Sequence, residues 1–193
     1  MLTRDQFDTA LALLTRERTI RQKKKDVTLP PLVQVTGERV ALHRLASAEA
    51  AIARHLSRLQ AAVAATAPLP VPSGAFGAMA PDESQAAAVN TAAASGVMVL
   101  TGGPGGGKTT GSKASLATYE AAGLQAICCA FAGKAALRMT EQTGRPAATI
   151  HSTLGLQPGG MPKHHEGEPL NADVVVVDEA SMVDTELFAQ LVS

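Results

Sequence analysis

Residues 97–110 read VMVLTGGPGGGKTT, an apolar run that stops at a turn containing five glycines. Residues 102–109 match the pattern G-x-x-x-x-G-K-[ST], here directly after an expected strand at 97–100 and opening an expected helix at 108–122. A turn without Cβ atoms can point successive N–H groups inward, and the helix that follows adds the positive end of its dipole. The stretch therefore predicts a loop that binds a phosphate group rather than a plain tight turn.

The turn and the start of its helix contain the candidate nucleotide ligands. Lys108 would reach the β- and γ-phosphates as a point charge, and the hydroxyl of Thr109 would ligate Mg²⁺. Backbone N–H groups of the turn would hold the remaining phosphate oxygens. The predicted ligands in this stretch are Gly103, Pro104, Gly105, Gly106, Gly107, Lys108, Thr109 and Thr110.

A second segment, VVVVDE at 174–179, supplies carboxylates that nucleotide hydrolysis requires. Four consecutive valines indicate a strand buried on both faces, and the strand ends in Asp178 and Glu179. Because the carboxyl ends of parallel strands lie at one edge of a sheet, these acids should face the glycine-rich turn. Asp178 would then hold Mg²⁺, and Glu179 would orient or deprotonate the attacking water. The alternative is that Asp178 caps the following helix. With Lys108, the two acids form the predicted catalytic set.

The order of elements in the second half of the chain predicts an α/β fold. Apolar runs at 126–130 and 174–177 alternate with helical patterns at 82–94 and 134–143. Such alternation is typical of a parallel sheet covered by helices on both faces. Aromatic residues make up only 3% of the chain, which fits an interior of Ala, Val and Leu.

The first part of the chain, residues 1–65, predicts a separate accessory region. A helical pattern covers 2–18. Short apolar-rich stretches at 32–35 and 39–42 then predict the two strands of a hairpin. Apolar residues then recur every three to four positions over 45–65, which predicts an amphipathic helix. The accessory region is therefore expected to consist of a helix, a hairpin and a helix.

Composition marks a boundary after this region. Residues 66–80 are rich in Pro and Gly and contain no charged side chain, which predicts a linker to a second domain at 81–193. The chain is neutral overall, yet residues 1–60 hold 11 basic against 6 acidic side chains. The basic run at 16–25 could attract nucleic acid, although a solvated helix face or a linker is the commoner meaning of such a run.

The sequence also favours a cytoplasmic protein that does not contact a membrane. No apolar stretch approaches the roughly 18 residues of a membrane span, and residues 1–19 carry both acids and bases, unlike a signal peptide. The two cysteines, Cys128 and Cys129, are adjacent and have the character of small core residues. His164 and His165 lack the usual spacing of zinc ligands, which favours a chance pair in a surface loop.

Three motifs, GGPGGGKTT, GRPAATIHSTLGL and VVVVDEASMVD, occur in this order and resemble the RecD-like helicases of superfamily 1, a group that includes the exonuclease V alpha subunit. The resemblance covers about residues 38–193. It implies ATP and Mg²⁺ as cofactors, 5′-to-3′ translocation on single-stranded DNA, a role in DNA repair, and other helicase-nuclease subunits as partners. The expected fold class is α/β, a RecA-like P-loop NTPase parallel sheet with flanking helices, preceded by a small α+β accessory region.

The resemblance assigns further roles by position. Gln85, in PDESQAAAV, matches a glutamine that reads the adenine, although on its own it is only a polar residue early in a helix. The segment TIH at 149–151 matches one that lies along the DNA strand. The residues expected to contact DNA are Phe131, Gly133, Thr149 and His151.

Two positions depart from the pattern of these helicases. Gly106 stands where Thr or Ser is usual, which removes a hydroxyl and loosens the turn. Residues 130–133 read AFAG where the helicases have Ala-Pro-Thr-Gly. Phe131 would either pack in the core, the favoured interpretation, or stack on a base.

The final residues, DTELFAQLVS at 184–193, form a helical pattern without a Gly or Pro stop signal. We therefore expect the N-terminal portion of a helicase, without the second motor domain that brings an arginine to the γ-phosphate. Such a portion alone should bind ATP·Mg²⁺ weakly and hydrolyse it barely. Two other functions remain open: a P-loop ATPase that remodels protein partners, and a non-catalytic subunit that binds a nucleotide.

Overall fold

The structure is a computed structural model that describes residues 3–22, 25–64, 67–77, 80–103, 107–157 and 160–193. The chain divides into two compact units, Met1–Ala53 and Arg54–Ser193, which are described separately. Helix α2 (His43–Ala64) contributes residues to both. No helix within the described ranges combines the length and the apolar character needed to cross a bilayer.

The first unit starts with a short helix, α1 (Arg4–Leu14). The Thr3 hydroxyl accepts a hydrogen bond from the N–H of Gln6, and the Gln6 side chain accepts one from the N–H of Thr3. This reciprocal capping box satisfies two donors that a helix start otherwise leaves unpaired. The helix has no buried residue, so local capping rather than core packing defines its start.

Two antiparallel hairpins follow in the same unit. The first pairs β1 (Arg18–Gln22) with β2 (Lys25–Leu29), and the second pairs β3 (Val33–Thr36) with β4 (Arg39–Leu42). In the second hairpin Gly37 has φ 60°, a left-handed value that glycine adopts without a Cβ penalty. This hairpin agrees with the one expected between residues 32 and 42.

The sequence does not predict the first hairpin, because the basic run at 16–25 favours a solvated helix face or a linker. That interpretation is wrong. β-branched residues favour strands, and the register places Thr19 opposite Thr28. The two threonine hydroxyls also lie 3.5 Å apart. Of the described residues in the basic run, 18–22 and 25 thus belong to a two-stranded ribbon.

The second unit is built on a three-stranded parallel sheet with the order β6–β5–β7. The strands are β5 (Ala126–Ala130), β6 (Ala147–Thr149) and β7 (Val174–Asp178). Their register places Ala130 opposite Thr149 on one side and opposite Asp178 on the other. The carboxyl ends of all three strands therefore share one edge of the sheet.

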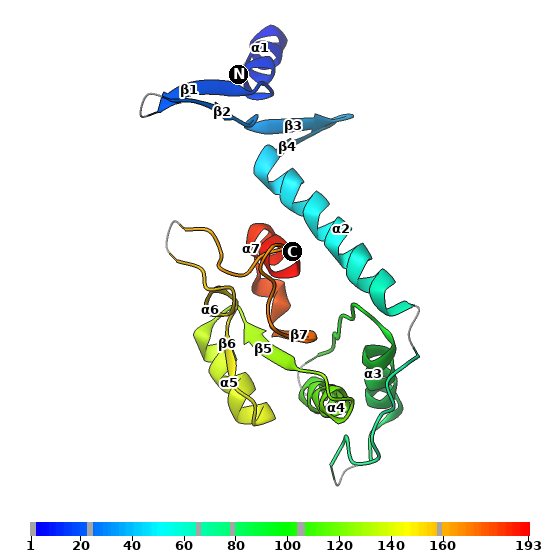
Figure 1. The fold of residues 1–193 in the computed structure, drawn as a ribbon. Coiled ribbons are helices and arrows are strands. Elements are labelled where there is room, and N and C mark those ends of the chain that lie inside the picture. The colour runs from blue at the N-terminus through cyan, green and yellow to red at the C-terminus, as the bar shows by residue number, and fades with distance from the viewer. Residues whose placement is uncertain (1–2, 23–24, 65–66, 78–79, 104–106, 158–159) are drawn as a thin grey trace. The chain divides into compact units, whose positions relative to one another are not determined.

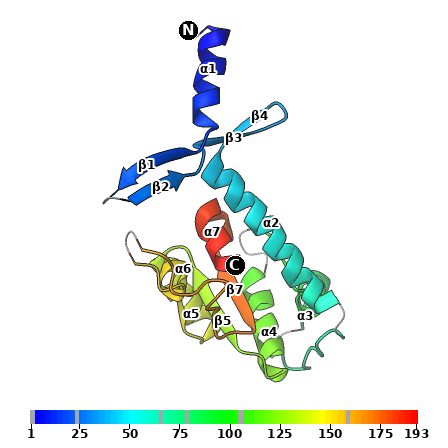
Figure 2. The same cartoon turned by 45° about the horizontal axis from the view of Figure 1, so that its top comes forward.

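Helices pack against both faces of this sheet. The helices that contact the sheet are α4 (Lys108–Ala121), α5 (Gly133–Thr143), α6 (Ile150–Thr153) and α7 (Thr185–Val192). Helix α3 (Glu83–Ala94) packs on α4, and the 3-10 helix η1 (Ala180–Met182) follows β7. Helices α4 and α5 pack on the face of the sheet that contains Cys128, and α6 and α7 pack on the face that contains Cys129; Figures 1 and 2 show these helices around β5. The α/β fold class is confirmed.

The adjacent cysteines of β5 belong to different layers of the core. Cys128 packs with Leu116 of α4 and Met139 of α5, whereas Cys129 packs with Ile150 of α6 and Leu187 of α7. This separation follows from the alternation of side chains along a strand. Burial raises the pKa of Cys128, and it raises the pKa of Cys129 to about 12. Both thiols are free core residues, as expected.

The apolar run at 97–100 is not a strand, and the prediction of one is wrong. Its residues have no strand partner, and the side chain of Val99 is 80% exposed. The N–H of Val97 instead donates to Oε1 of Gln60 on α2 at 3.0 Å. A Cβ on Gly96 would overlap the backbone carbonyl of Leu59, so glycine permits this close approach. The contacts with α2 replace the expected pairing in the sheet.

Candidate functional site

Helix α4 begins at the glycine-rich turn, as the motif predicts. Its N-cap, Gly107, has φ 70° and ψ 9°, and no side chain caps the helix there. By contrast, the carboxylates of Asp82 and Asp184 cap α3 and α7. An uncapped helix start presents unpaired N–H groups and the positive end of the dipole, which together suit an anion. The predicted ligands Pro104, Gly105 and Gly106 lie outside the described residues.

Lys108 is folded back over the turn. Its Nζ donates to the carbonyl oxygens of Gly102 at 2.5 Å and Gly103 at 2.8 Å. The ammonium group is therefore already held at the turn by two neutral acceptors. The next residue, Thr109, is exposed, while Thr110 is partly buried.

The side chain of Gln85 on α3 lies against Gly107 of the turn. Its N–H donates to Oδ1 of Asp82 at 2.8 Å, and its Oε1 accepts from the N–H of Asp82 at 3.2 Å. The hydroxyl of Ser84 and then the N–H of Gln85 lower the pKa of Asp82. A Cβ on Gly107 would overlap the carboxamide of Gln85, so the two residues meet only because position 107 is glycine. The structure thus brings together Gln85 and the glycine-rich turn.

The acidic pair lies at the carboxyl end of β7. Asp178 is partly buried, and its Oδ1 accepts the N–H of Glu179 at 2.9 Å. It does not cap the next helices: η1 has no side-chain cap, and Asp184 caps α7 by accepting the N–H of Leu187 at 2.9 Å. The alternative role of Asp178 as a helix cap is therefore wrong.

The four expected DNA contacts lie together at the carboxyl ends of β5 and β6. The rings of Phe131 and His151 are 6.1 Å apart between centroids and tilted by 59°. A Cβ on Gly133 would be 4.0 Å from Cγ2 of Thr149. The Thr149 hydroxyl caps α6 by accepting the N–H of Ser152 at 3.1 Å. We call Phe131, Gly133, Thr149 and His151 the strand-end cluster.

Phe131 is also part of the core. It is partly buried and packs against the hydrophobic cluster that contains Cys129, Ile150 and Leu154. This packing is the interpretation that the sequence favoured for the aromatic residue. Its ring also forms the tilted pair with His151 described above.

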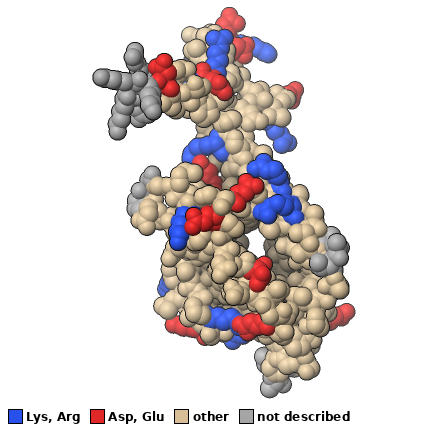
Figure 3. Space-filling view, viewed as in Figure 1, with Lys and Arg blue, Asp and Glu red and all other residues tan. Residues whose placement is uncertain are grey.

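The charge of the second unit is balanced rather than basic. Residues 54–193 carry 8 Lys and Arg against 11 Asp and Glu. On the face shown in Figure 3, acidic and basic side chains are interspersed over this unit. Contacts to a nucleic acid at the strand-end cluster would therefore depend on rings, hydroxyls and backbone groups more than on many phosphate contacts.

Lys108 and the acidic pair belong to the same unit but are not joined directly. Among the described residues, no hydrogen bond or ion pair links Lys108 to Asp178 or Glu179. Their convergence on one bound triphosphate stays a prediction. The strand register does place Asp178 in one row with Ala130 and Thr149, next to the strand-end cluster.

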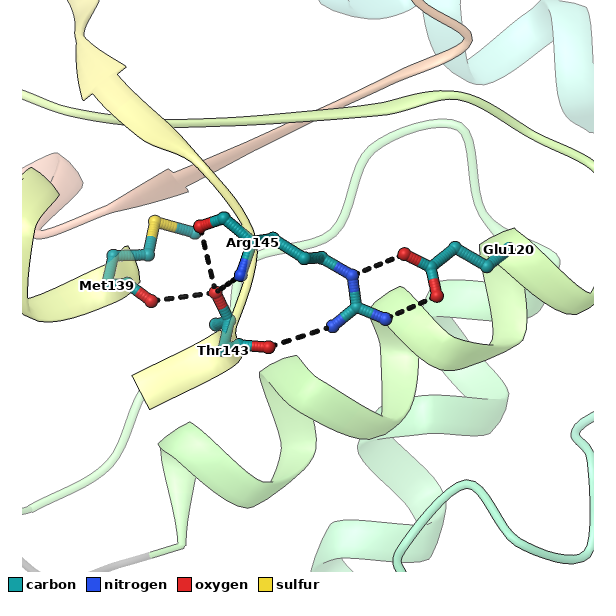
Figure 4. A network of polar contacts seen from close by, with 4 residues as sticks. All are labelled: Glu120, Met139, Thr143 and Arg145. Atoms are coloured by element: carbon teal, nitrogen blue, oxygen red, sulfur yellow. Dashed lines mark hydrogen bonds and ion pairs between the residues drawn. The ribbon is translucent and has the colours of Figure 1, made fainter. Parts of the chain in front are cut away.

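A polar network that the sequence did not reveal joins α4 to the turn before β6. The guanidinium of Arg145 faces the Glu120 carboxylate as a fork, with Nε bonded to Oε1 and Nη2 bonded to Oε2 at 2.5 Å (Figure 4). Its Nη1 donates to the carbonyl of Thr143 at 3.3 Å. The Thr143 hydroxyl donates to the carbonyl of Met139 at 2.7 Å. The network fixes the far end of α4 against α5.

We expect Arg145→Ala to lower the free energy of unfolding by about 1 kcal/mol, because the ion pair is partly exposed but bidentate. Urea denaturation of the full-length protein measures this change. The hydrogen bond from Arg145 lowers the pKa of Glu120, so the contribution is present near neutral pH and is lost as the pH falls below about 4. Arg145→Lys keeps the charge but not the fork and should recover only part of the loss. An equal loss at pH 3 and pH 7 would show that the pair is not the cause.

Residues 85–193 match the family model described as AAA domain, which is more than half of the chain. The chain belongs to the AAA domain family. Its matched part contains the glycine-rich turn, the three strands of the sheet, the acidic pair and the strand-end cluster. The AAA domain thus includes each predicted nucleotide and DNA residue in this chain.

Relatives of this AAA domain confirm the RecD-like resemblance. The ATP-dependent RecD2 DNA helicase of Deinococcus radiodurans is 43% identical over 111 residues, which cover 58% of this chain and 15% of that protein. The RecBCD enzyme subunit RecD of Mycolicibacterium smegmatis is 35% identical over 187 aligned positions, covering 84% of this chain and 33% of that protein. The RecBCD enzyme subunit RecD of Haemophilus influenzae is 32% identical over 134 positions. This chain spans about a third or less of the length of these relatives.

Proposed function

We propose that this chain is the ATP-binding part of a helicase that translocates along single-stranded DNA, acting in DNA repair in the cytoplasm. One observation carries the proposal: Lys108 lies at the uncapped start of α4, an arrangement that suits a phosphate, and over 111 residues the chain is 43% identical to a helicase. Two of the relatives described above are subunits of the RecBCD enzyme, which supports other helicase-nuclease subunits as partners.

The residues present fit a nucleotide and Mg²⁺. The left-handed Gly107 and the uncapped helix start suit phosphate oxygens, and Lys108 would exchange its contacts with carbonyl oxygens for contacts with the β- and γ-phosphates. The exposed hydroxyl of Thr109 and the carboxylate of Asp178 are the hard oxygen ligands that Mg²⁺ prefers. ATP supplies the phosphoanhydride bond, and Glu179 would accept a proton from the attacking water.

We propose that the strand-end cluster contacts the DNA. Its residues lie in the row of strand ends that also contains Asp178, so a strand of nucleic acid there would touch the same edge that acts on ATP. His151 could donate to a phosphate or sugar, and the exposed side of Phe131 could stack on a base. Gln85 would read the adenine through its carboxamide.

We also propose the organisation into domains. Residues 1–65 would form the accessory region, 66–80 the linker and 81–193 the first motor domain. The hydrogen bond between Gln60 and Val97 supports a direct contact between the end of α2 and the motor domain. On its own, the 193-residue chain would hydrolyse ATP barely.

The test is ATP hydrolysis by the full-length protein with and without single-stranded DNA. We expect DNA to raise kcat at least about tenfold, because phosphoryl transfer depends on how precisely the groups around the phosphate are positioned, and DNA would bind at the same strand ends as Asp178. Stimulation by a protein partner but not by DNA would favour the remodelling ATPase. Nucleotide binding without hydrolysis in any condition would favour the non-catalytic subunit. Either result would overturn the proposal.

A further inference from the structure

Glu179 is held in an unusual conformation at the end of β7. Its backbone has φ 51° and ψ 40°, and among the described residues it is the one non-glycine with positive φ. Such a conformation costs free energy unless surrounding contacts hold it, and it is enriched at functional sites. One of these contacts is the hydrogen bond from its N–H to Asp178.

The second contact comes from Arg138 of α5. Nη1 of Arg138 lies 3.7 Å from Oε1 of Glu179, and the two side chains are 55% and 40% exposed. At this exposure an ion pair is weak enough to open without unfolding anything else. The guanidinium nevertheless lies beside one of the two oxygens of the Glu179 carboxylate.

Helix α5 connects this contact to the strand-end cluster. The helix begins at Gly133, a member of that cluster, and Arg138 follows in its second turn. Ala135 and Ala136 are buried together with Ala130, so the start of α5 is packed on the carboxyl end of β5. Because a helix moves largely as a rigid element, a shift of the turn at 131–133 would also move Arg138.

We infer that Arg138 is a positioning residue that restrains Glu179 until single-stranded DNA binds at the strand-end cluster. A general base must point a carboxylate oxygen at its water, and the ion pair with Arg138 holds Oε1 of Glu179 toward α5. Movement of α5 on DNA binding releases that oxygen. The inference rests on the proposed function, because it assigns Glu179 to hydrolysis.

The experiment compares Arg138→Ala with the wild type in the full-length protein. The kcat without DNA is expected to rise about two- to fivefold, which is the population change that an exposed ion pair supports. The kcat at saturating single-stranded DNA should stay within about twofold of wild type, since the pair is open in that state. Affinity for a non-hydrolysable ATP analogue and the unfolding midpoint should not change.

Two further variants separate restraint from general effects on the helix. Arg138→Lys keeps a cation within reach of Glu179 and should keep the DNA-free rate near that of wild type. Glu141→Ala alters an exposed side chain of the same helix and should leave both rates unchanged.

Several outcomes would overturn the inference. For Arg138→Ala, these outcomes are an equal loss of kcat with and without DNA, or no change in either kcat. A lower unfolding midpoint with an unchanged ratio of the two kcat values would also count against it. So would a rise of the DNA-free kcat in Glu141→Ala. In each of these cases, DNA-stimulated hydrolysis by the wild type would leave the proposed function standing. Absence of hydrolysis by the wild type, with and without DNA, would instead refute the proposed function and this inference with it.

Discussion

Replacing Lys108 by alanine is expected to weaken ATP binding about 10- to 100-fold, the range for losing charge-assisted hydrogen bonds. Lys108 is the cation at the start of α4, and its present acceptors, the carbonyls of Gly102 and Gly103, are neutral. Doubly charged phosphates are better acceptors for an ammonium group than carbonyls are. Isothermal titration calorimetry of the full-length protein with a non-hydrolysable ATP analogue measures the change.

A matched control for this variant lies on the same helix. Lys113→Ala removes one exposed positive charge from α4 and should leave the affinity within about twofold, because exposed charges away from a site contribute little. Unchanged affinity in Lys108→Ala would remove the phosphate role from Lys108. Equal losses in the two variants would point to net charge rather than to a specific contact.

Replacing Glu179 by glutamine should lower kcat of the full-length protein by about 10²- to 10⁴-fold, the contribution of a positioned general base. Glutamine keeps the size of the side chain but cannot accept the proton of the attacking water. Binding of ATP should persist, because the phosphate ligands of the turn are unchanged. Single-turnover hydrolysis measured beside calorimetric titration separates the chemical step from binding.

The control for Glu179→Gln is Glu141→Gln, which makes the same chemical change at an exposed site on α5. Its kcat should match that of wild type. A Glu179→Gln variant that retains more than a tenth of the wild-type kcat would exclude Glu179 as the base and would also remove the premise for a restraint by Arg138.

Buried strands and long helices of the AAA domain could be predicted because their signals are local. The apolar run 126–130 is β5 in the structure, and the four valines before Asp178 form β7. The run at 97–100 is also apolar but makes no ladder, and Gly96 and Val97 are in contact with α2 instead. Residue composition indicates whether a segment is apolar enough to be buried, whereas the strand or helix that it contacts depends on the tertiary fold.

Single residues of the candidate site were predicted to different degrees. The spacing of Asp82 and Gln85 fits a capping box, a local pattern that could have suggested why a carboxamide stands there. The short strand β6 was missed because three residues give too little periodicity to detect. The pairing of Arg138 with Glu179 has no sequence signal, since it joins residues 41 positions apart through the fold.

The alternation of side chains along β5 has a consequence for how this domain can change. Deleting or inserting one residue within 126–130 would exchange the surroundings of Cys128 and Cys129, and it would also break the alignment of Ala130 with Thr149 and Asp178. A shift of one residue in this strand would thus disturb both the core packing and the row of strand ends that contains Asp178. Length variation compatible with this sheet should accordingly accumulate in the connections and leave the central strand untouched.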